Sequence, residues 1–511
     1  MKRALAILLM LACLMAGCTQ NYDAYVPTGD GLTNDDAGPS SPSGGDDQAL
    51  TLTYYPDITL NPYLCTDFTN RVLFGLLFQR LFVVSRDYRV EPMLCKSYQV
   101  SKDKKTYTFY IEDTATFSDG TLLTAEDVVA SLNAAKASNY YSGRFLQIKS
   151  VALSGDGGVK ISLKTPCENL PILLDIPIVK ASEVNENRPL GTGPYYLDNS
   201  SVNPCLRRRT DWWCSAQMVV TASTIALVKA ESTTQIRDNF QFSDLGLVCA
   251  DPGSDRYADY RCDYELWDIE NGIFLYLACN EKSSTFSDPE VRAALTYAID
   301  RDYLVSAYYR GFARSATLPA SPQAPYYSTT LAKKYAYDGT TFQQVISDKG
   351  LKGKTITFLV NSDDSLRVRV AREIKKALES AGLVVKMKEV STTLYKETLL
   401  YKTYDIYLGQ TALSANMDLS AFLYSSGKLS YGSIDDAATY AVGLRALENE
   451  GNYYTLHQMV MEQGILCPIL FRSYAVFATR GLLSNLTPAR DNVFYYSLGR
   501  SMEEALIPNE T

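Results

Sequence analysis

The sequence predicts an α/β protein with more than one domain. Residues 351–409 contain strand, helix, strand, helix and strand, an order that implies parallel strands in a helix-covered sheet. The chain has 511 residues, which is too long for one compact core and indicates two or three domains. Its composition, 46% hydrophobic and 21% charged, is typical of globular proteins.

The first predicted elements lie before residue 112. Residues 50–55 have the composition of a strand, and Leu60-Asn61-Pro62 follows, where the proline ends any extended ladder. Residues 71–82 are apolar and predict a helix. In residues 106–111 the apolar side chains alternate, which predicts a half-buried strand with one buried face: Tyr107, Phe109 and Ile111.

Two helices have recognisable starts. A turn at residues 118–120 precedes Thr124-Ala125-Glu126-Asp127, which resembles a capping box with Asp in place of the usual Glu. Ser287-Asp288-Pro289-Glu290 begins a second helix. The apolar residues of that helix share one face: Val291, Ala294, Leu295, Ala298 and Ile299.

The clearest α/β unit starts with a strand at residues 355–360. Gly382 is placed to cap the helix that follows, and strands at 383–390 and 405–408 complete the unit. The helix has a buried stripe of four residues: Ala371, Ile374, Leu378 and Ala381. Gly191-Thr192-Gly193-Pro194 lacks the lysine and the helix of a phosphate-binding loop, so we predict a tight turn before a strand at 195–197.

The amino terminus predicts export. A positive start, Met1-Lys2-Arg3, precedes an apolar run at residues 4–15, shorter than the roughly 20 residues that span a bilayer. Leu14-Met15-Ala16-Gly17-Cys18 resembles a bacterial lipobox, with Met15 where leucine is usual. We therefore expect a signal peptide at 1–17, a lipidated (palmitate-bearing) Cys18 and a protein held on the extracytoplasmic face of the cell membrane. The alternative is an ordinary secretory signal with an incidental cysteine.

Residues 19–48 predict a disordered linker. They are rich in Asp, Gly, Pro and Ser and contain no Lys or Arg, so they cannot bury enough apolar surface to fold.

Composition also excludes some functions. The net charge of −8 disfavours a nucleic-acid partner. His457 is the single histidine, which leaves no multi-histidine metal site, and we interpret it as a structural residue. Apart from Cys13 and Cys18 there are nine cysteines without a Cys-x-x-Cys spacing, for which disulfides and buried thiols both stay open. We expect neither a metal nor a cofactor.

Several motifs in order resemble the extracellular solute-binding proteins of family 5, which include dipeptide-, oligopeptide- and nickel-binding lipoproteins of ABC transporters. The resemblance covers most of residues 50–480. Each motif is weak alone, but their order and spacing are specific. They are Leu60-Asn61-Pro62, Thr106–Phe109, Phe117–Thr121, Thr124–Val128, Gly191–Tyr195, Asn280, Asp288–Leu295 and Ala298–Arg301.

The resemblance implies a two-lobe periplasmic-binding-protein-like fold, type II, with an extra inserted domain. Projected onto this chain, lobe one is 49–75 with 188–270 and 470–511. The inserted domain is 76–187 and lobe two is 271–469.

The resemblance further implies a non-enzymatic substrate-binding lipoprotein of an ABC importer, which captures a small solute and delivers it to the permease. A peptide is the expected solute, and a monomer is the expected state. The implied ligand-binding residues are Tyr55, Asn61, Asn280, Gln410 and Asp418.

This chain departs from the family where peptide binders hold the ligand's ammonium. Peptide-binding members usually carry Gly-Trp and then an Asp after the strand that here ends at Gly409, whereas this chain has Gln410 and, near the acidic position, Leu413 or Ser414. Asp418 is the nearest carboxylate. A buried ammonium without a carboxylate is strongly unfavourable, so we predict that residues 410–418 select the ligand in another way.

Three alternatives belong to other functional classes. One is a signalling or chaperone lipoprotein on the same fold, and another is a binding protein for a non-peptide organic solute. The third is a secreted glycosidase with a pair of carboxylates, which needs no histidine, although nothing in the sequence places two carboxylates together.

Overall fold

The computed structural model describes residues 50–200, 203–252, 260–432, 434–483 and 485–507, all within one compact unit that runs from Asp46 to Thr511. The predicted signal peptide, Cys18 and the linker at 19–48 lie outside the described residues. Among the helices that are described, none is long and apolar enough to cross a membrane.

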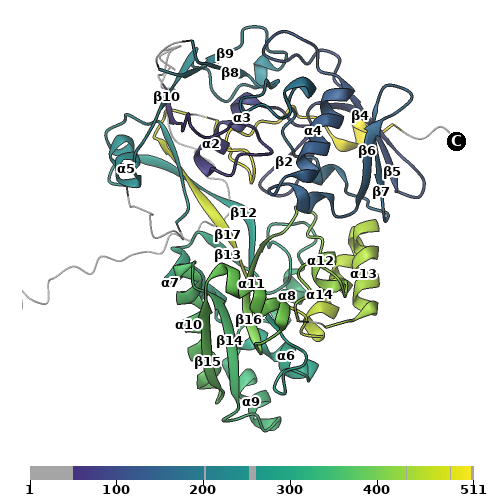
Figure 1. The fold of residues 1–511 in the computed structure, drawn as a ribbon, viewed down its shortest axis with the longest axis vertical. Helices are drawn as coiled ribbons and strands as arrows, with labels where there is room; N and C mark the ends of the chain where they lie inside the picture. Colours follow the sequence, from purple (N-terminus) through teal and green to yellow (C-terminus); the bar gives the residue numbers. More distant parts are fainter. Residues whose placement is uncertain (1–49, 201–202, 253–259, 433, 484, 508–511) are drawn as a thin grey trace, which may run out of the picture. The chain divides into compact units, whose positions relative to one another are not determined.

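Two long strands connect the two lobes of the fold (Figure 1). They are β12 (Tyr264–Cys279) and β17 (Cys467–Thr479), which pair antiparallel along most of their length. The pairing is interrupted between Glu270 and Phe274, at Gly272, whose φ is 72°. The full sheet has the order β11-β17-β12-β16-β14-β15, and β13 also pairs with β17. Its other strands are β11 (Leu247–Ala250), β13 (Ala313–Ser315), β14 (Thr355–Asn361), β15 (Val384–Val390) and β16 (Ile406–Ala412).

The predicted strand–helix–strand unit of the second lobe is confirmed. β14 pairs in parallel with both β15 and β16, and α10 (Ser365–Ser380) packs against β14 and β15. All four residues of the predicted stripe are buried. Gly382 follows the helix with φ 105°, a backbone conformation that favours glycine.

The first lobe contains a four-stranded sheet of order β1-β10-β9-β8. β1 (Leu50–Thr53) pairs in parallel with β10 (Thr224–Val228), and β9 (Cys205–Arg208) and β8 (Tyr195–Asp198) follow antiparallel. A strand therefore follows Gly191–Pro194, as predicted.

A second four-stranded sheet, β4-β5-β7-β6, lies within the range predicted as an inserted domain. Its strands are β4 (Cys95–Val100), β5 (Thr106–Ile111), β6 (Ile148–Leu153) and β7 (Val159–Leu163). Tyr107 and Phe109 of β5 are buried, as the alternation predicts. α4 (Ala125–Ala137) contacts this sheet, and its predicted capping box is present: Asp127 Oδ2 accepts from the Thr124 backbone N–H at 2.8 Å.

The helix predicted over residues 71–82 is wrong. The segment forms two short helices, α2 (Phe68–Val72) and α3 (Phe74–Leu77), and then turns extended at Phe78 and enters β2 (Phe82–Val84). Nearly every residue of this stretch is buried, including the polar Gln79 and Arg80, so its sequence shows no amphipathic helical period. The packing of the surrounding core decides its conformation instead.

The helix predicted from residue 287 begins as expected but is shorter. Asp288 caps α6 (Pro289–Ala294), and the last predicted turn, Leu295–Ala298, is a 3₁₀ helix. The remaining named elements are β3 (Val90–Pro92), α5 (Thr233–Gln241), α7 (Arg301–Tyr309), α8 (Thr329–Lys334), α9 (Gly339–Asp348), α11 (Thr392–Tyr401), α12 (Ser420–Leu423), α13 (Ala437–Glu448), α14 (Tyr453–Glu462) and α15 (Met502–Ala505).

Candidate ligand-binding cleft

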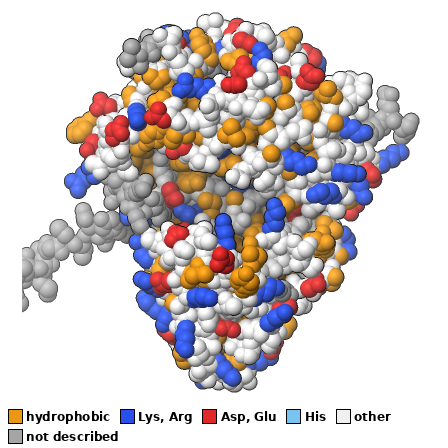
Figure 2. All heavy atoms as spheres, in the orientation of Figure 1, with side chains coloured by type: hydrophobic (Ala, Val, Ile, Leu, Met, Phe, Trp, Pro, Cys, Tyr) orange, Lys and Arg blue, Asp and Glu red, His pale blue; other side chains and the backbone are white. Residues whose placement is uncertain are grey.

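The surface is hollowed midway along the molecule, at the level of β12 and β17 (Figure 2). Because these two strands connect the lobes, their exposed side chains lie where a bound solute would touch both. Three groups of side chains lie on or beside β12 and β17: an arginine–aspartate–glutamine group, an aromatic wall, and a buried charge network.

The first group is centred on Arg472 of β17. Its Nη2 pairs with Asp251 Oδ2 at 2.6 Å, and its Nη1 donates to Gln410 Oε1 at 3.4 Å. Gln410 stands on β16 opposite Leu275 of β12. The Asp251 carboxylate is thus already paired with a cation, and Gln410 belongs to the polar lining next to β17.

The aromatic wall contains Phe68, Tyr474 and Tyr140. Phe68 at the start of α2 packs against Tyr474 of β17 with ring centroids 4.2 Å apart. Tyr140 follows α4 and is 49% exposed, yet desolvation is the main cause that raises the pKa of its hydroxyl. The Arg71 guanidinium carbon lies 3.4 Å from the centroid of this ring, a cation–π contact.

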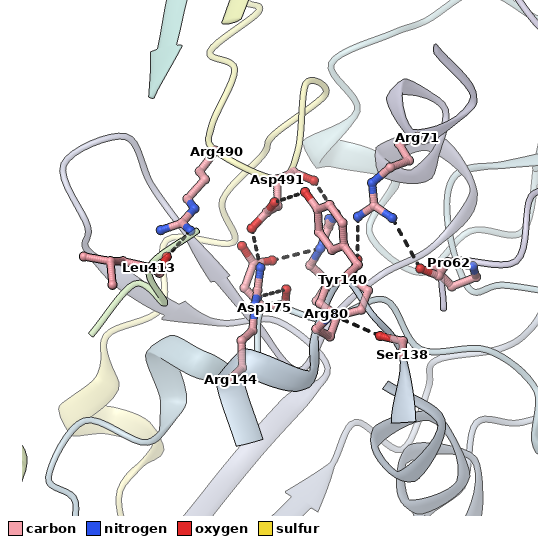
Figure 3. A network of polar contacts seen from close by, with 11 residues as sticks. Pro62, Arg71, Arg80, Ser138, Tyr140, Arg144, Asp175, Leu413, Arg490 and Asp491 are labelled. Atoms are coloured by element: carbon pink, nitrogen blue, oxygen red, sulfur yellow. Dashed lines mark hydrogen bonds and ion pairs between the residues drawn. The ribbon is translucent and has the colours of Figure 1, made fainter. Parts of the chain in front are cut away.

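The buried charge network joins segments that are distant in sequence (Figure 3). Arg80 Nε lies 2.8 Å from Asp175 Oδ1, and both side chains are almost fully buried. Arg144 forms an ion pair with Asp491 and donates to the Asp175 carbonyl oxygen at 2.6 Å. Asp491 also accepts from the Tyr140 hydroxyl at 2.9 Å.

The arginines keep Asp491 ionised. Burial alone would raise the pKa of its carboxyl group, but Arg144, Arg490 and Arg71 together lower it below its ordinary value. Two carboxylates, Asp175 and Asp491, lie among the four arginines of this network, and the Glu270 carboxylate also acts on Arg490.

Arg490 occupies a space that depends on Gly272. Its Nη2 donates to the Leu413 carbonyl oxygen, and its buried Nη1 has no acceptor among the described residues. A Cβ at residue 272 would overlap the guanidinium. The interruption in the β12–β17 pairing thus makes room for a cation between the connecting strands and the second lobe.

The structure does not bring the five predicted ligand-binding residues together. Asn61 is fully buried, and its Nδ2 donates to the carbonyl oxygens of Val184 and Glu186 at 2.9 and 2.8 Å. Asn280 likewise donates to the carbonyl oxygens of Lys402 and Tyr404 at 3.1 and 3.0 Å. Both amides hold backbone segments in place, and neither lies in the three groups described above.

Tyr55 and Asp418 also lie outside these groups. The Tyr55 backbone N–H donates to Asn70 Oδ1 at 2.9 Å. Asp418 is 7% exposed; its Oδ1 accepts from the Ser420 N–H at 2.8 Å and its Oδ2 accepts from Gln147 at 3.2 Å. Of the five, only Gln410 joins the polar lining of the cleft, through Arg472.

Four residues of these groups were not predicted from the sequence: Arg71, Tyr140, Arg490 and Asp491. Arg71 and Tyr141 are 70 residues apart and meet only in the folded protein. Asp491 lies in an irregular segment near the carboxyl terminus with no motif of its own. The sequence shows only that Arg71 and Tyr140 lie in or next to apolar segments. An apolar segment can line a cleft or belong to the core, so this pattern does not predict a binding site.

The histidine and the cysteines of the described chain show no arrangement for catalysis or metal binding. His457 is fully buried, as its structural interpretation predicts. The nine cysteines outside the predicted signal peptide and lipidation site are free thiols, which resolves the alternative that the sequence left open. Within the described ranges, no group of His, Cys, Asp and Glu side chains could hold a metal ion.

Two α/β lobes joined by a pair of continuous strands, with polar and aromatic side chains near the junction, form the architecture of binding proteins that close by hinge motion. The chain belongs to the bacterial extracellular solute-binding proteins, family 5: residues 89–432 match the family model described as "Family 5 Middle". This is a family of solute-binding proteins rather than of enzymes.

Curated relatives include glutathione-binding proteins GsiB. The protein from Escherichia coli strain K12 is 25% identical over 349 residues, which cover 64% of this chain and 66% of the relative. The one from Shigella dysenteriae serotype 1 is 24% identical with the same coverage. The match thus spans just under two thirds of the length of these relatives.

Solved structures share the fold over most of the chain. HbpA2 from Haemophilus parasuis has a TM-score of 0.73 at 16% identity and covers 89% of this chain and 100% of its own. NikA from Brucella suis, in complex with Fe(III)-EDTA, has 0.70 at 18% identity, with 88% and 98% covered. AppA from Bacillus subtilis, in complex with a nonapeptide, has 0.61 at 20% identity, with 89% and 99% covered.

Proposed function

We propose that the protein captures a solute, in the first instance a peptide, in the cleft between its lobes and delivers it to the permease of an ABC importer. The observation that carries the proposal is the pair of strands β12 and β17, which lead from one lobe into the other with their pairing interrupted at Gly272. Such a connection permits hinge closure around a ligand. Family membership supports the same function.

The peptide class rests on the relatives and on the lining of the cleft. The relatives include glutathione-binding proteins and a protein in complex with a nonapeptide. Phe68 and Tyr474 offer flat apolar walls, and Gln410 and Arg472 offer a hydrogen-bond acceptor and donors for amide groups. Gln410 is therefore the residue of segment 410–418 that we propose to contact the solute.

The remaining parts of the proposal rest on sequence. We place the protein outside the cytoplasm, as its family name implies, and tethered through a lipid on Cys18 with residues 19–48 as a linker. We also retain the domain boundaries at 75/76, 187/188, 270/271 and 469/470. Fractionation of host cells checks the anchor: Cys18→Ser should leave the membrane fraction, and equal membrane partition of wild type and variant would refute it.

A peptide-retention experiment tests the main proposal. The chain purified from its host and stripped of ligand by mild denaturation and refolding is mixed with a library of tri- to pentapeptides. Gel filtration and mass spectrometry of the protein fraction then identify bound peptides. We expect a subset to be retained, with a rise in melting temperature through preferential binding to the folded state. No retained peptide and no rise would overturn the peptide assignment.

A further inference from the structure

Like Arg490, Arg71 lacks a carboxylate partner in the network of Figure 3. It forms no ion pair in the described part of the chain, whereas Arg80 and Arg144 pair with Asp175 and Asp491. Its three hydrogen-bond acceptors are all neutral: the Pro62 and Cys65 carbonyl oxygens at 3.3 and 3.2 Å from Nη1, and the Tyr141 hydroxyl at 3.0 Å from Nη2.

These contacts hold the guanidinium in one orientation. The half-exposed Tyr140 ring covers one face of it, and its Nε has no acceptor among the described residues. Nη2 donates one of its two hydrogens to Tyr141, so one further donor remains. Nε–H and Nη2–H on the same edge of an arginine take both oxygens of a carboxylate, a geometry that lysine cannot reproduce.

The surroundings also favour an anion. Asp491, the nearest carboxylate, is engaged by Arg144 and by the Tyr140 hydroxyl. Arg71 is among the arginines that lower the pKa of the Asp491 carboxyl, so its positive charge also acts on an anion placed beside it. Asp251 is already paired with Arg472. The three groups described above therefore contain no unpaired carboxylate that could bind an ammonium group of the solute.

We propose that Arg71, backed by the Tyr140 ring, binds a carboxylate of the solute, so that this protein recognises its ligand through an acidic end. This inference rests on the proposed function and narrows it to carboxylate-bearing solutes.

The test compares two peptide libraries of the same composition, one with free carboxyl termini and one amidated. Wild type, Arg71→Gln, Arg71→Lys and the control Arg480→Gln are compared; Arg480 is an exposed arginine that pairs with Asp263 outside the cleft region. Wild type and Arg480→Gln should retain the free acids about tenfold or more over the amides. Arg71→Gln should lose that preference, and Arg71→Lys should recover only part of it.

Equal retention of acids and amides by wild type, or an unchanged preference in Arg71→Gln, would overturn the carboxylate site and leave the peptide-binding function standing. Retention of neither library would overturn the peptide function, and citrate then serves as a second probe. Citrate should raise the melting temperature of wild type more than that of Arg71→Gln, relative to sodium chloride of equal ionic strength. Equal shifts in both proteins would overturn the carboxylate site as well.

Discussion

His457 lies on α14 with both ring nitrogens buried and without a hydrogen-bond partner in the described protein. Burial lowers the pKa of its imidazole to about 3. The unfolded chain protonates this side chain below its ordinary pKa of about 6.5, while the folded protein keeps it neutral. Stability is therefore lost as the pH falls from about 6.5 toward 3.

Replacing His457 by leucine, which has a similar volume, removes this acid sensitivity. We expect the free energy of unfolding at pH 7 to stay equal or rise, because two unpaired polar atoms leave the core. At pH 5 the variant should gain about 2 kcal/mol more over wild type than it does at pH 7. Urea titrations at both pH values measure this difference, and an identical gain at pH 7 and pH 5 would contradict the explanation.

Single residues were predictable where one local rule applies. The structural role of His457 followed from its being the single histidine of the chain. Asn61 and Asn280 were chosen by resemblance, and the structure gives them a structural role: their amides each hold two carbonyl groups from a distant segment. The site around Arg71 and Tyr140 depends on tertiary contacts, for which the sequence has no local signal.

At the scale of elements, the connecting strand β12 depends on one glycine. Gly272 has φ 72°, and a Cβ there would overlap the Arg490 guanidinium. Gly272→Ala should lower the free energy of unfolding by about 3 kcal/mol, through backbone strain of about 1 kcal/mol plus displacement of a buried cation. Denaturant titration measures the loss.

Gly353 provides the matched control for this substitution. Its φ is 78°, and no atom lies within 4 Å of the position that a Cβ would take. Gly353→Ala therefore carries the strain alone and should cost about 1 kcal/mol. Equal losses for the two variants would show that Arg490 does not depend on the space at Gly272.

Elements with an amphipathic period or a cap were predicted well. The alternation in β5, the capping box of α4 and the strand–helix–strand order around α10 all correspond to the structure, because each pattern reflects a local balance of burial and hydrogen bonding. The helix expected over residues 71–82 failed for the opposite reason. A stretch that is buried on every side has no exposed face, so the sequence shows no period that would predict a helix. The packing of the rest of the core determines its conformation.

At the scale of the whole molecule, the range predicted as an inserted domain contacts the range predicted as lobe two. The Glu168 N–H donates to the Leu447 carbonyl oxygen at 2.8 Å, and Asn169 Nδ2 donates to Glu450 Oε1 at 2.8 Å. Gln147 Nε2 also donates to Asp418 Oδ2 at 3.2 Å, between the same two ranges. These few polar contacts are of a kind that a hinge motion can break and re-form at small cost.

The class of fold was predictable because the motifs of the family occur in order along the chain. The composition of the cleft was not, since its wall draws on α2, the end of α4, β16, β17 and the segment near Asp491. The departure at Gln410 indicated that the ligand is held in an unusual way. The proposed role of Arg71 rests only on the three-dimensional arrangement around Tyr140 and Tyr141.

Small-angle X-ray scattering with and without a retained peptide tests the central claim most directly, because the claim is that the two lobes close on a solute about β12 and β17. We predict that saturating peptide lowers the radius of gyration and that an equal concentration of a non-retained peptide leaves it unchanged. A scattering profile that does not change under saturation, while the melting temperature rises, would show binding without closure and would contradict the account.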